Sequence, residues 1–222
     1  MSKVLGPVII DDFFTKQEIA QIYKTVNEQM YKGLIESGDK WQEFNKNPSN
    51  GFVALMHLTE LVPQNIKDKF RDKVTELIGE QAAPVGVLWA RYSLDSGVDP
   101  TLMPHCDRSE KHMGYYCNVE LDSNIDWDFY MVEEKIPMKR NRAVFFTGTH
   151  MPHWRPDYFF QPDDFYDIIL FQTTAMSNYD QNKPTLTEDF RDEMDELCNK
   201  VSNKYKDKLT IGLNRKMNVP RY

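Results

Sequence analysis

The stretch AVFFTGTHMPHWR, residues 143–155, decides how the rest of the chain is interpreted. It opens with four apolar or aromatic residues that end at a turn, which is typical of a short buried β-strand. The similar runs around it are Val85–Leu94, Gly114–Leu121, Trp127–Val132 and Ile168–Thr173. Short strands in such a series are typical of β-sandwiches and barrels. The middle of the chain is therefore predicted to be an antiparallel β-core.

Helical patterns flank this core. Thr15 and Glu18 form a capping box, and the apolar residues that follow at helical spacing predict a helix over about 16–31. Residues 32–50 are polar and are expected to form a loop. The other elements expected outside the core are strands at residues 7–10 and 52–58, a helix from Pro63 and a helix capped by Thr187. The pattern predicts an α+β protein, mainly β, with helices around the sheets.

Length and composition restrict the class of protein. The 222 residues suffice for one domain with a sizeable core. The net charge of −7 argues against a nucleic-acid partner, because such affinity comes mainly from Lys and Arg. The three cysteines include no C-x-x-C pair, so neither a disulfide framework nor a zinc ribbon is indicated. Without a leader or a long apolar run, we expect a soluble cytoplasmic protein with no membrane partner.

His105-Cys106-Asp107 and the later His153 are the candidate metal ligands. In an extended strand residues i and i+2 point to the same side, so His105 and Asp107 can face one ion while Cys106 faces away. Two histidines and one carboxylate are the set that binds non-haem Fe(II) on one face and leaves the other positions open. An isolated H-x-D is common by chance, so the prediction depends on the strands around it.

Two alternatives stay open at this stage. His150 could serve as the third ligand in place of His153, although Pro152 and the His-Trp-Arg order favour His153. The same set could also hold a hydrolytic Zn²⁺. A zinc hydrolase generally needs a positioned general base, and the sequence contains no H-E-x-x-H motif that would supply one.

The order of these features resembles the Fe(II)/2-oxoglutarate-dependent oxygenase superfamily, in particular its prolyl-4-hydroxylase-like branch. The residues that carry the resemblance are Tyr92, Gly97, His105-x-Asp107, the strand ending Phe-Phe-Thr-Gly, and His153-x-Arg155. The resemblance covers roughly residues 7–174. It implies a double-stranded β-helix, or jelly roll, with His105, Asp107 and His153 as catalytic iron ligands. It also implies 2-oxoglutarate as co-substrate with O₂, and succinate and CO₂ as co-products.

One departure from the family pattern concerns the co-substrate. The family usually places an Arg or Lys about ten residues after the second histidine, where it pairs with the far carboxylate of 2-oxoglutarate. Here residues 161–167 are acidic. Arg155 is the preferred substitute, because at i+2 from the histidine it would face the same pocket. Arg142 and Arg91 are the other candidates, and Tyr92 is expected to donate a hydrogen bond to the same carboxylate.

The resemblance predicts a single oxygenase domain over residues 1–222. Within it, 1–84 form an N-terminal strand and helix buttress, 85–174 the jelly-roll core, and 175–222 a C-terminal helical extension. The expected reaction is hydroxylation of a C–H bond in a peptidyl, first of all prolyl, or small-molecule substrate. The alternative is a jelly-roll module that binds metal or ligand without turnover. The apolar stripe of the last helix is expected to dock on its own domain or on a second copy in a homodimer.

Overall fold

Two antiparallel sheets form the centre of the protein. The computed structural model describes residues 3–37, 46–47, 52–55, 58–96, 99–107, 112–179 and 186–210. The larger sheet has seven strands in the order β1 (Val8–Ile10), β9 (Ala143–Phe146), β6 (Gly114–Ser123), β11 (Tyr166–Thr174), β4 (Gly86–Tyr92), β3 (Phe52–Leu55) and β2 (Lys46–Asn47). The smaller sheet has the order β5 (Leu102–His105), β10 (His153–Arg155), β7 (Phe129–Met131) and β8 (Glu134–Ile136).

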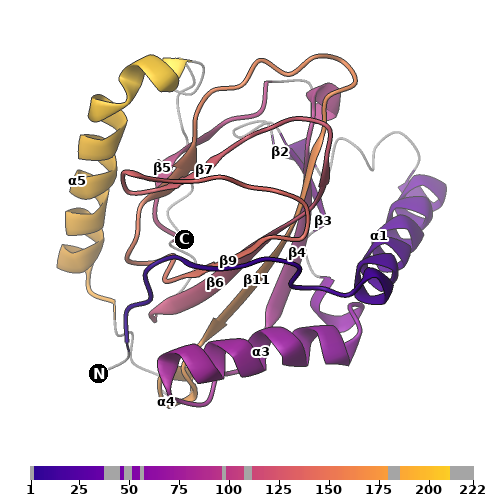
Figure 1. The fold of residues 1–222 in the computed structure, drawn as a ribbon, viewed down its shortest axis with the longest axis horizontal. Coiled ribbons are helices and arrows are strands. Elements are labelled where there is room, and N and C mark those ends of the chain that lie inside the picture. The colour runs from indigo at the N-terminus through magenta and orange to yellow at the C-terminus, as the bar shows by residue number, and fades with distance from the viewer. Residues whose placement is uncertain are drawn as a thin grey trace.

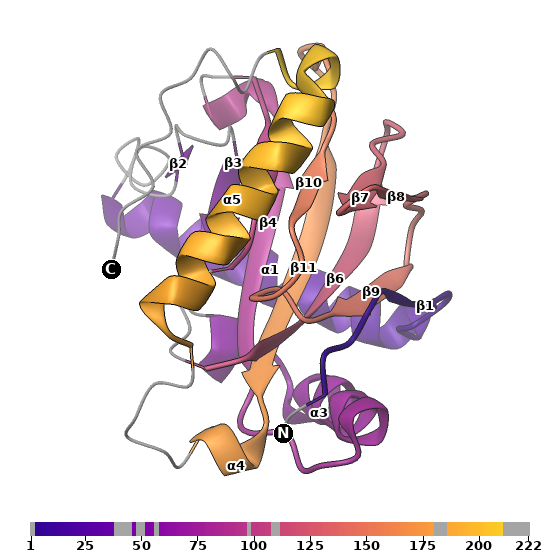
Figure 2. The ribbon, with the colours of Figure 1, turned by 90° about the vertical axis from the view of Figure 1, so that its left-hand side faces the viewer.

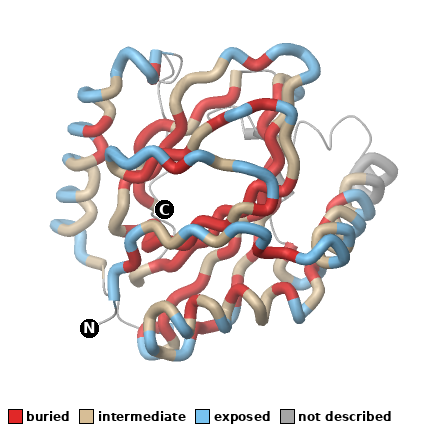
Figure 3. The backbone as a smooth tube through the Cα atoms, viewed as in Figure 1, coloured by how far each residue is buried: buried red, intermediate tan, exposed pale blue. Residues whose placement is uncertain are grey.

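Helices cover the outer faces of both sheets (Figure 1). The helices α1 (Lys16–Ser37) and α3 (Gln64–Ile78) pack on the seven-stranded sheet, where Phe70 stacks on Phe145 and Phe171. The short helix α4 (Met176–Tyr179) follows β11, and α5 (Glu188–Lys204) lies across another side of the molecule (Figure 2). Buried residues follow the strands and the helix faces turned toward them (Figure 3).

Side chains alternate between two environments along the strands of the larger sheet. In β4, Val87 and Trp89 belong to the core under α1 and α3, whereas Ala90 and Tyr92 belong to a separate cluster between the sheets. This alternation follows from the two-residue period of a strand. It means that the space between the sheets is lined by every second residue of β4, β6 and β11.

The apolar stripe of α5 docks on its own domain. Val201 is buried in a cluster with Met103, Tyr130 and Trp154 of the smaller sheet. Trp154 alternates with the two β10 residues that face the larger sheet, so it points outward beneath the helix. The stripe is therefore used within the chain, and a homodimer through this helix stays a prediction.

Most of the expected elements are present, with one clear error. The capping box is confirmed, because the Thr15 N–H donates to Glu18 Oε2 at 2.7 Å and the Glu18 N–H donates to Thr15 Oγ1 at 3.2 Å. The expectation of a loop from residue 32 was wrong over residues 32–37, which continue α1. A single glycine in this segment costs only about 1 kcal/mol and does not end a helix. Most of residues 38–51, and Gly97, lie outside the described residues.

In the part of the chain that the structure describes, there is no helix both long and apolar enough to cross a membrane.

Candidate metal site

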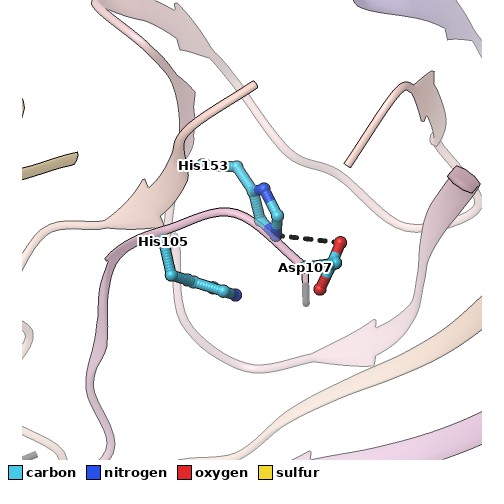
Figure 4. Close-up of side chains that lie close together, drawn as sticks. All are labelled: His105, Asp107 and His153. Carbon is cyan, nitrogen blue, oxygen red and sulfur yellow. Dashed lines mark ion pairs between the residues drawn. The ribbon is translucent and has the colours of Figure 1, made fainter. Parts of the chain in front are cut away.

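His105 and His153 are brought together by strand pairing. They stand directly opposite each other in the antiparallel pair of β5 and β10. Cross-strand partners of this kind have Cβ atoms about 5 Å apart on one face of a sheet. Their imidazole rings accordingly lie 4.3 Å apart between centroids (Figure 4). Residues 48 positions apart in the chain thus form one corner of the site because of the register of two short strands.

Asp107 is held beside the histidines by the turn after β9. Its backbone N–H donates to the carbonyl of Gly148 at 3.0 Å. One carboxylate oxygen lies 3.6 Å from His153 Nε2, the contact drawn as a dashed line in Figure 4. Gly148 is required for this approach, since a Cβ there would lie 2.1 Å from Asp107 Oδ2 and 2.5 Å from the Tyr116 ring. One donor atom from each of the three residues lies within 4.8 Å of the others.

The hydrogen bonds of the two imidazoles leave the same nitrogen available on each ring. His105 Nδ1 lies 2.8 Å from the carbonyl of Met103, and His153 Nδ1 lies 3.0 Å from the carbonyl of Met151. A carbonyl can only accept, so each Nδ1 carries a proton, and in the neutral ring Nε2 keeps its lone pair. A bond of this type is the usual outer support of a metal-binding histidine.

Burial keeps His153 neutral. Desolvation, and in second place the nearby His105, hold the pKa of His153 well below its ordinary value. The ring is enclosed by aromatic neighbours, with Phe146 edge-on at 4.9 Å and Phe129 at 5.8 Å. These rings exclude water from one side of the site. The neutral imidazole is also the form that can donate a lone pair to a metal ion.

Arg155 lies between the sheets on the same strand as His153. It is only 1% exposed, and its guanidinium lies 4.4 Å from the centroid of Tyr166 and near the rings of Trp127 and Phe129. It donates to the carbonyl of Trp127 and to the Tyr166 hydroxyl. Stacking against three aromatic faces and two hydrogen bonds explain how a full charge is accommodated in the interior.

A buried carboxylate balances this charge. The Tyr166 hydroxyl, at 3.0 Å from Arg155, donates in turn to Glu120 Oε2 at 2.7 Å. Burial raises the pKa of the Tyr166 phenol, so it stays protonated and can make that donation. Ser123 donates to the other oxygen of Glu120 at 2.9 Å. The result is a continuous polar chain from β10 through β11 to β6 in an otherwise aromatic interior.

Tyr92 is another buried residue with a polar group between the two sheets. It is 4% exposed and meets Trp127 edge-on at 5.1 Å. Burial raises the pKa of its phenol to about 12, and the charges of Arg155 and Asp107 act on it with opposite sign. The phenol is therefore within electrostatic reach of both the Asp107 carboxylate and the buried Arg155 guanidinium.

The other two predicted arginines face elsewhere. Arg91 lies on the helix-covered face of β4 and forms two hydrogen bonds of 2.7 Å with the buried Asp167. Arg142 pairs with Asp11, with Nε at 2.7 Å from Oδ1. His150, the alternative third ligand, bonds Thr149 through Nδ1 at 2.8 Å and is absent from the three-residue cluster found among the described residues.

The sequence analysis did not predict that Glu120 and Tyr166 form hydrogen-bonded polar groups beside Arg155 in the interior. A usable signal existed: Asn118 and Glu120 share the face of Tyr116 in the otherwise apolar run 114–121. Two polar residues at strand spacing inside a fully buried run indicate a polar interior, because an uncompensated buried carboxylate is too costly to persist. The Asn118 Oδ1 atom is buried and has no hydrogen-bond partner among the described residues.

A narrow pocket opens beside the carboxylate of the site. Cys106, Asp107 and Thr149 line one wall, and the start of α5 lines the other with Phe190, Arg191 and Met194, preceded by Leu186. The ring of Phe190 lies 4.5 Å from that of His150. The first turns of α5 thus form the outer wall next to the candidate metal ligands.

Solved structures share this architecture. HygX from Streptomyces hygroscopicus, crystallised with nickel and 2-oxoglutarate, matches over 85% of this chain and 90% of its own, with TM-score 0.57 and 10% identity. A Trichoplax adhaerens prolyl hydroxylase in complex with a hypoxia-inducible-factor peptide matches over 78% and 84%, with TM-score 0.53 and 14% identity. The chain has the jelly-roll fold of the Fe(II)/2-oxoglutarate-dependent oxygenases.

SnoN, a non-haem α-ketoglutarate-dependent epimerase from nogalamycin biosynthesis, matches over 77% of this chain and 78% of its own, with TM-score 0.55 and 8% identity. No family model matches the sequence. No curated protein matches it either. At such low identities the likeness establishes the fold, and the predicted jelly roll is confirmed.

Proposed function

We propose that the protein is an Fe(II)- and 2-oxoglutarate-dependent dioxygenase that hydroxylates a C–H bond of a peptidyl, for example prolyl, or small-molecule substrate. Succinate and CO₂ are the co-products. The observation that carries the proposal is the convergence of His105, Asp107 and His153, with both Nε2 lone pairs available. The prolyl hydroxylase with its bound peptide and HygX with bound hygromycin B have this fold. They support both substrate classes.

The residues fit ferrous iron. Two neutral imidazoles and one carboxylate, all from one side, leave the remaining coordination positions open. With 2-oxoglutarate and O₂, iron in such a site supplies the oxidising power that converts C–H into C–OH. His105 and His153 would hold the ion through Nε2, and Asp107 would supply the anionic ligand. Phe146 and Phe129 would keep water away from His153.

Arg155 is the residue we assign to the far carboxylate of 2-oxoglutarate. Two residues along a strand correspond to about 6.7 Å, so its backbone lies roughly that far from His153 on the same face. A five-carbon dicarboxylate that chelates the metal at one end reaches about that distance. The hydrogen bonds to Trp127 and Tyr166 leave further guanidinium N–H groups for a bidentate contact. Tyr92 is the expected second donor.

We further propose that residues 1–222 form one oxygenase domain. Strand β1, from the 1–84 segment, pairs with β9 of the 85–174 core. Helix α5, from the 175–222 extension, contributes Val201 to the cluster on the smaller sheet. Both flanking segments therefore complete the core rather than form cores of their own.

The experiment that tests the function uses the full chain, anaerobic Fe(II) and 2-oxoglutarate. We expect a visible metal-to-ligand charge-transfer band on addition of both, and succinate on admission of O₂. His105→Ala should remove both signals. Arg155→Met should lower the affinity for 2-oxoglutarate by about 10–100-fold, the equivalent of a charged hydrogen bond, while metal binding persists.

Arg142→Met is the matched control, because it removes an arginine that pairs with Asp11 at the surface rather than facing the interior. It should leave 2-oxoglutarate affinity unchanged. If wild-type protein binds iron but gives neither the band nor succinate, the dioxygenase assignment is wrong. That result would favour the non-catalytic module, in which Arg155 serves only to stabilise the interior through Tyr166 and Trp127.

A further inference from the structure

A pair of buried cysteines adjoins the metal site and has no part in the proposed reaction. Cys106 lies between His105 and Asp107, and Cys198 lies in the middle of α5. The two Sγ atoms are 3.9 Å apart, and the residues are 6% and 7% exposed. Their thiols therefore face each other across the interface between the helix and the metal-ligand segment.

The third cysteine lies in a different part of the molecule. Cys117 is fully buried among the residues that pack under α1 and α3. It sits on β6 of the larger sheet and points toward the helices, whereas Cys106 follows β5 of the smaller sheet. Only one intramolecular pairing is thus prepared by the fold, and Cys117 provides an internal control.

We propose that Cys106 and Cys198 are a redox modification site, at which a peroxide converts the two thiols into a disulfide. The sulfur atoms would have to approach from 3.9 Å to the disulfide length of about 2.0 Å. Closing this gap would take side-chain rotation and a small shift of helix α5. Since Cys198 belongs to a single packed helix, the approach does not require the sheets to move.

The pocket beside Asp107 gives a small oxidant access to one sulfur. Cys106 lines this pocket, which has room for about one water molecule. Hydrogen peroxide, with two oxygen atoms, is slightly larger. In the first step the Cys106 sulfur attacks one peroxide oxygen, the O–O bond breaks, and sulfenic acid and water form. In the second step the Cys198 sulfur displaces that hydroxyl as water, so two thiols are oxidised and one peroxide is reduced.

The disulfide would link α5 to the residue between two candidate metal ligands. Helix α5 carries Phe190 and Met194, which form the outer wall of the pocket. A covalent link through Cys198 would hold that wall in place and pull the His105–Asp107 segment toward the helix. The consequence expected for the oxidised protein is a changed affinity for a divalent metal ion, restored by reduction.

The test uses reduced, metal-free full-length protein treated with hydrogen peroxide, then alkylated and analysed by intact mass and peptide mapping. We expect the loss of two hydrogen atoms, a cross-linked peptide pair containing Cys106 and Cys198, and full reversal by dithiothreitol. Cys198→Ser and Cys106→Ser should prevent the loss. Cys117→Ala should not, and a thermal melt of each variant checks that it is folded.

If a variant fails to fold, the wild-type protein alone still tests the proposal, because differential alkylation identifies directly which cysteines are paired. Both thiols remaining alkylatable after peroxide, a disulfide to Cys117, or only intermolecular dimers would overturn the proposal. Nickel titration of oxidised and reduced protein then measures the coupling to the site. The thiol readout requires no metal, so its failure is distinct from failure of the dioxygenase assignment.

Discussion

Replacement of Gly148 by alanine is the sharpest single test of how the candidate metal site is built. A Cβ at this position would lie 2.1 Å from Asp107 Oδ2 and 2.5 Å from Cδ2 of Tyr116. Ordinary contact begins at 3.4 Å, so the oxygen would have to retreat by about 1.3 Å and the ring carbon by about 0.9 Å. Tyr116 is only 1% exposed and packed against Phe146, so the carboxylate has the greater freedom to move.

Displacement of Asp107 by this amount should weaken metal binding more than it weakens the fold. Productive constellations tolerate errors of about 0.5 Å, and disturbed support of a ligand typically costs 10–100-fold in metal affinity. Overpacking in the core costs about 1–3 kcal/mol, and each kcal/mol lowers Tm by roughly 2–4 °C in a domain of this size. Gly148→Ala should therefore remain folded while its affinity for Ni²⁺ falls at least tenfold, by about 1.4 kcal/mol or more.

Calorimetric titration with Ni²⁺ measures the first effect, and thermal unfolding followed by circular dichroism measures the second. Gly6→Ala is the matched control, because the Cβ it adds meets no atom within 4 Å. It should bind nickel like wild type. A folded Gly148→Ala protein with undiminished nickel affinity would show that Asp107 is not a ligand held by this close approach.

The remaining predictions concern two ion pairs. Burial raises the pKa of Glu18, but hydrogen bonds from Lys69 and from the N-cap residue outweigh it and lower the pKa below 4.5. The charged form of Glu18 thus stabilises the protein above that pH and loses its effect as the pH falls through the lowered pKa. Urea unfolding should show Glu18→Gln about 1 kcal/mol less stable at pH 7, with the difference vanishing in acid; a difference constant with pH would contradict this. Arg91→Met should cost about 1–3 kcal/mol, because it removes the partly exposed cation that pairs with the buried carboxylate of Asp167. Replacing both Arg91 and Asp167 by apolar residues should recover part of that loss, and no recovery would show that the cost lies in packing.

The sequence predicted which three residues converge better than it predicted the strands that hold them together. H-x-D at strand spacing and a later histidine after an apolar strand were enough to select the three residues that converge. Local pattern sufficed because two of them belong to one short segment. The partner strand β10 escaped prediction, since three residues between two prolines carry no apolar run. Its existence depends on pairing with β5 and β7, which is a property of the whole fold.

Choosing among the three arginines also required the structure. Each lies in or at the start of a strand, and the sequence does not show which face of the sheet each occupies. Arg91 lies between Ala90 and Tyr92 in β4 and therefore points to the opposite face of the sheet, although it is next to Tyr92 in the sequence. The partners Asp167 and Asp11 are 76 and 131 residues away from their arginines. Ion pairs of such separation cannot be predicted from local spacing.

The position of Arg155 on β10 determines how the proposed metal ligand and co-substrate anchor can move relative to each other. The family resemblance places this cation about ten residues after the second histidine, which in this chain is just before β11. Its interior-facing residues Tyr166 and Ile168 instead pack in the aromatic cluster between the sheets. With the cation on β10, one three-residue strand carries both the proposed metal ligand His153 and the proposed co-substrate anchor Arg155. The distance between His153 and Arg155 is then fixed by the rise per residue of one strand, rather than by the packing of one strand against another. Movement of the smaller sheet would therefore carry metal ligand and anchor together, and the chelated co-substrate would move with them relative to Glu120 and the larger sheet.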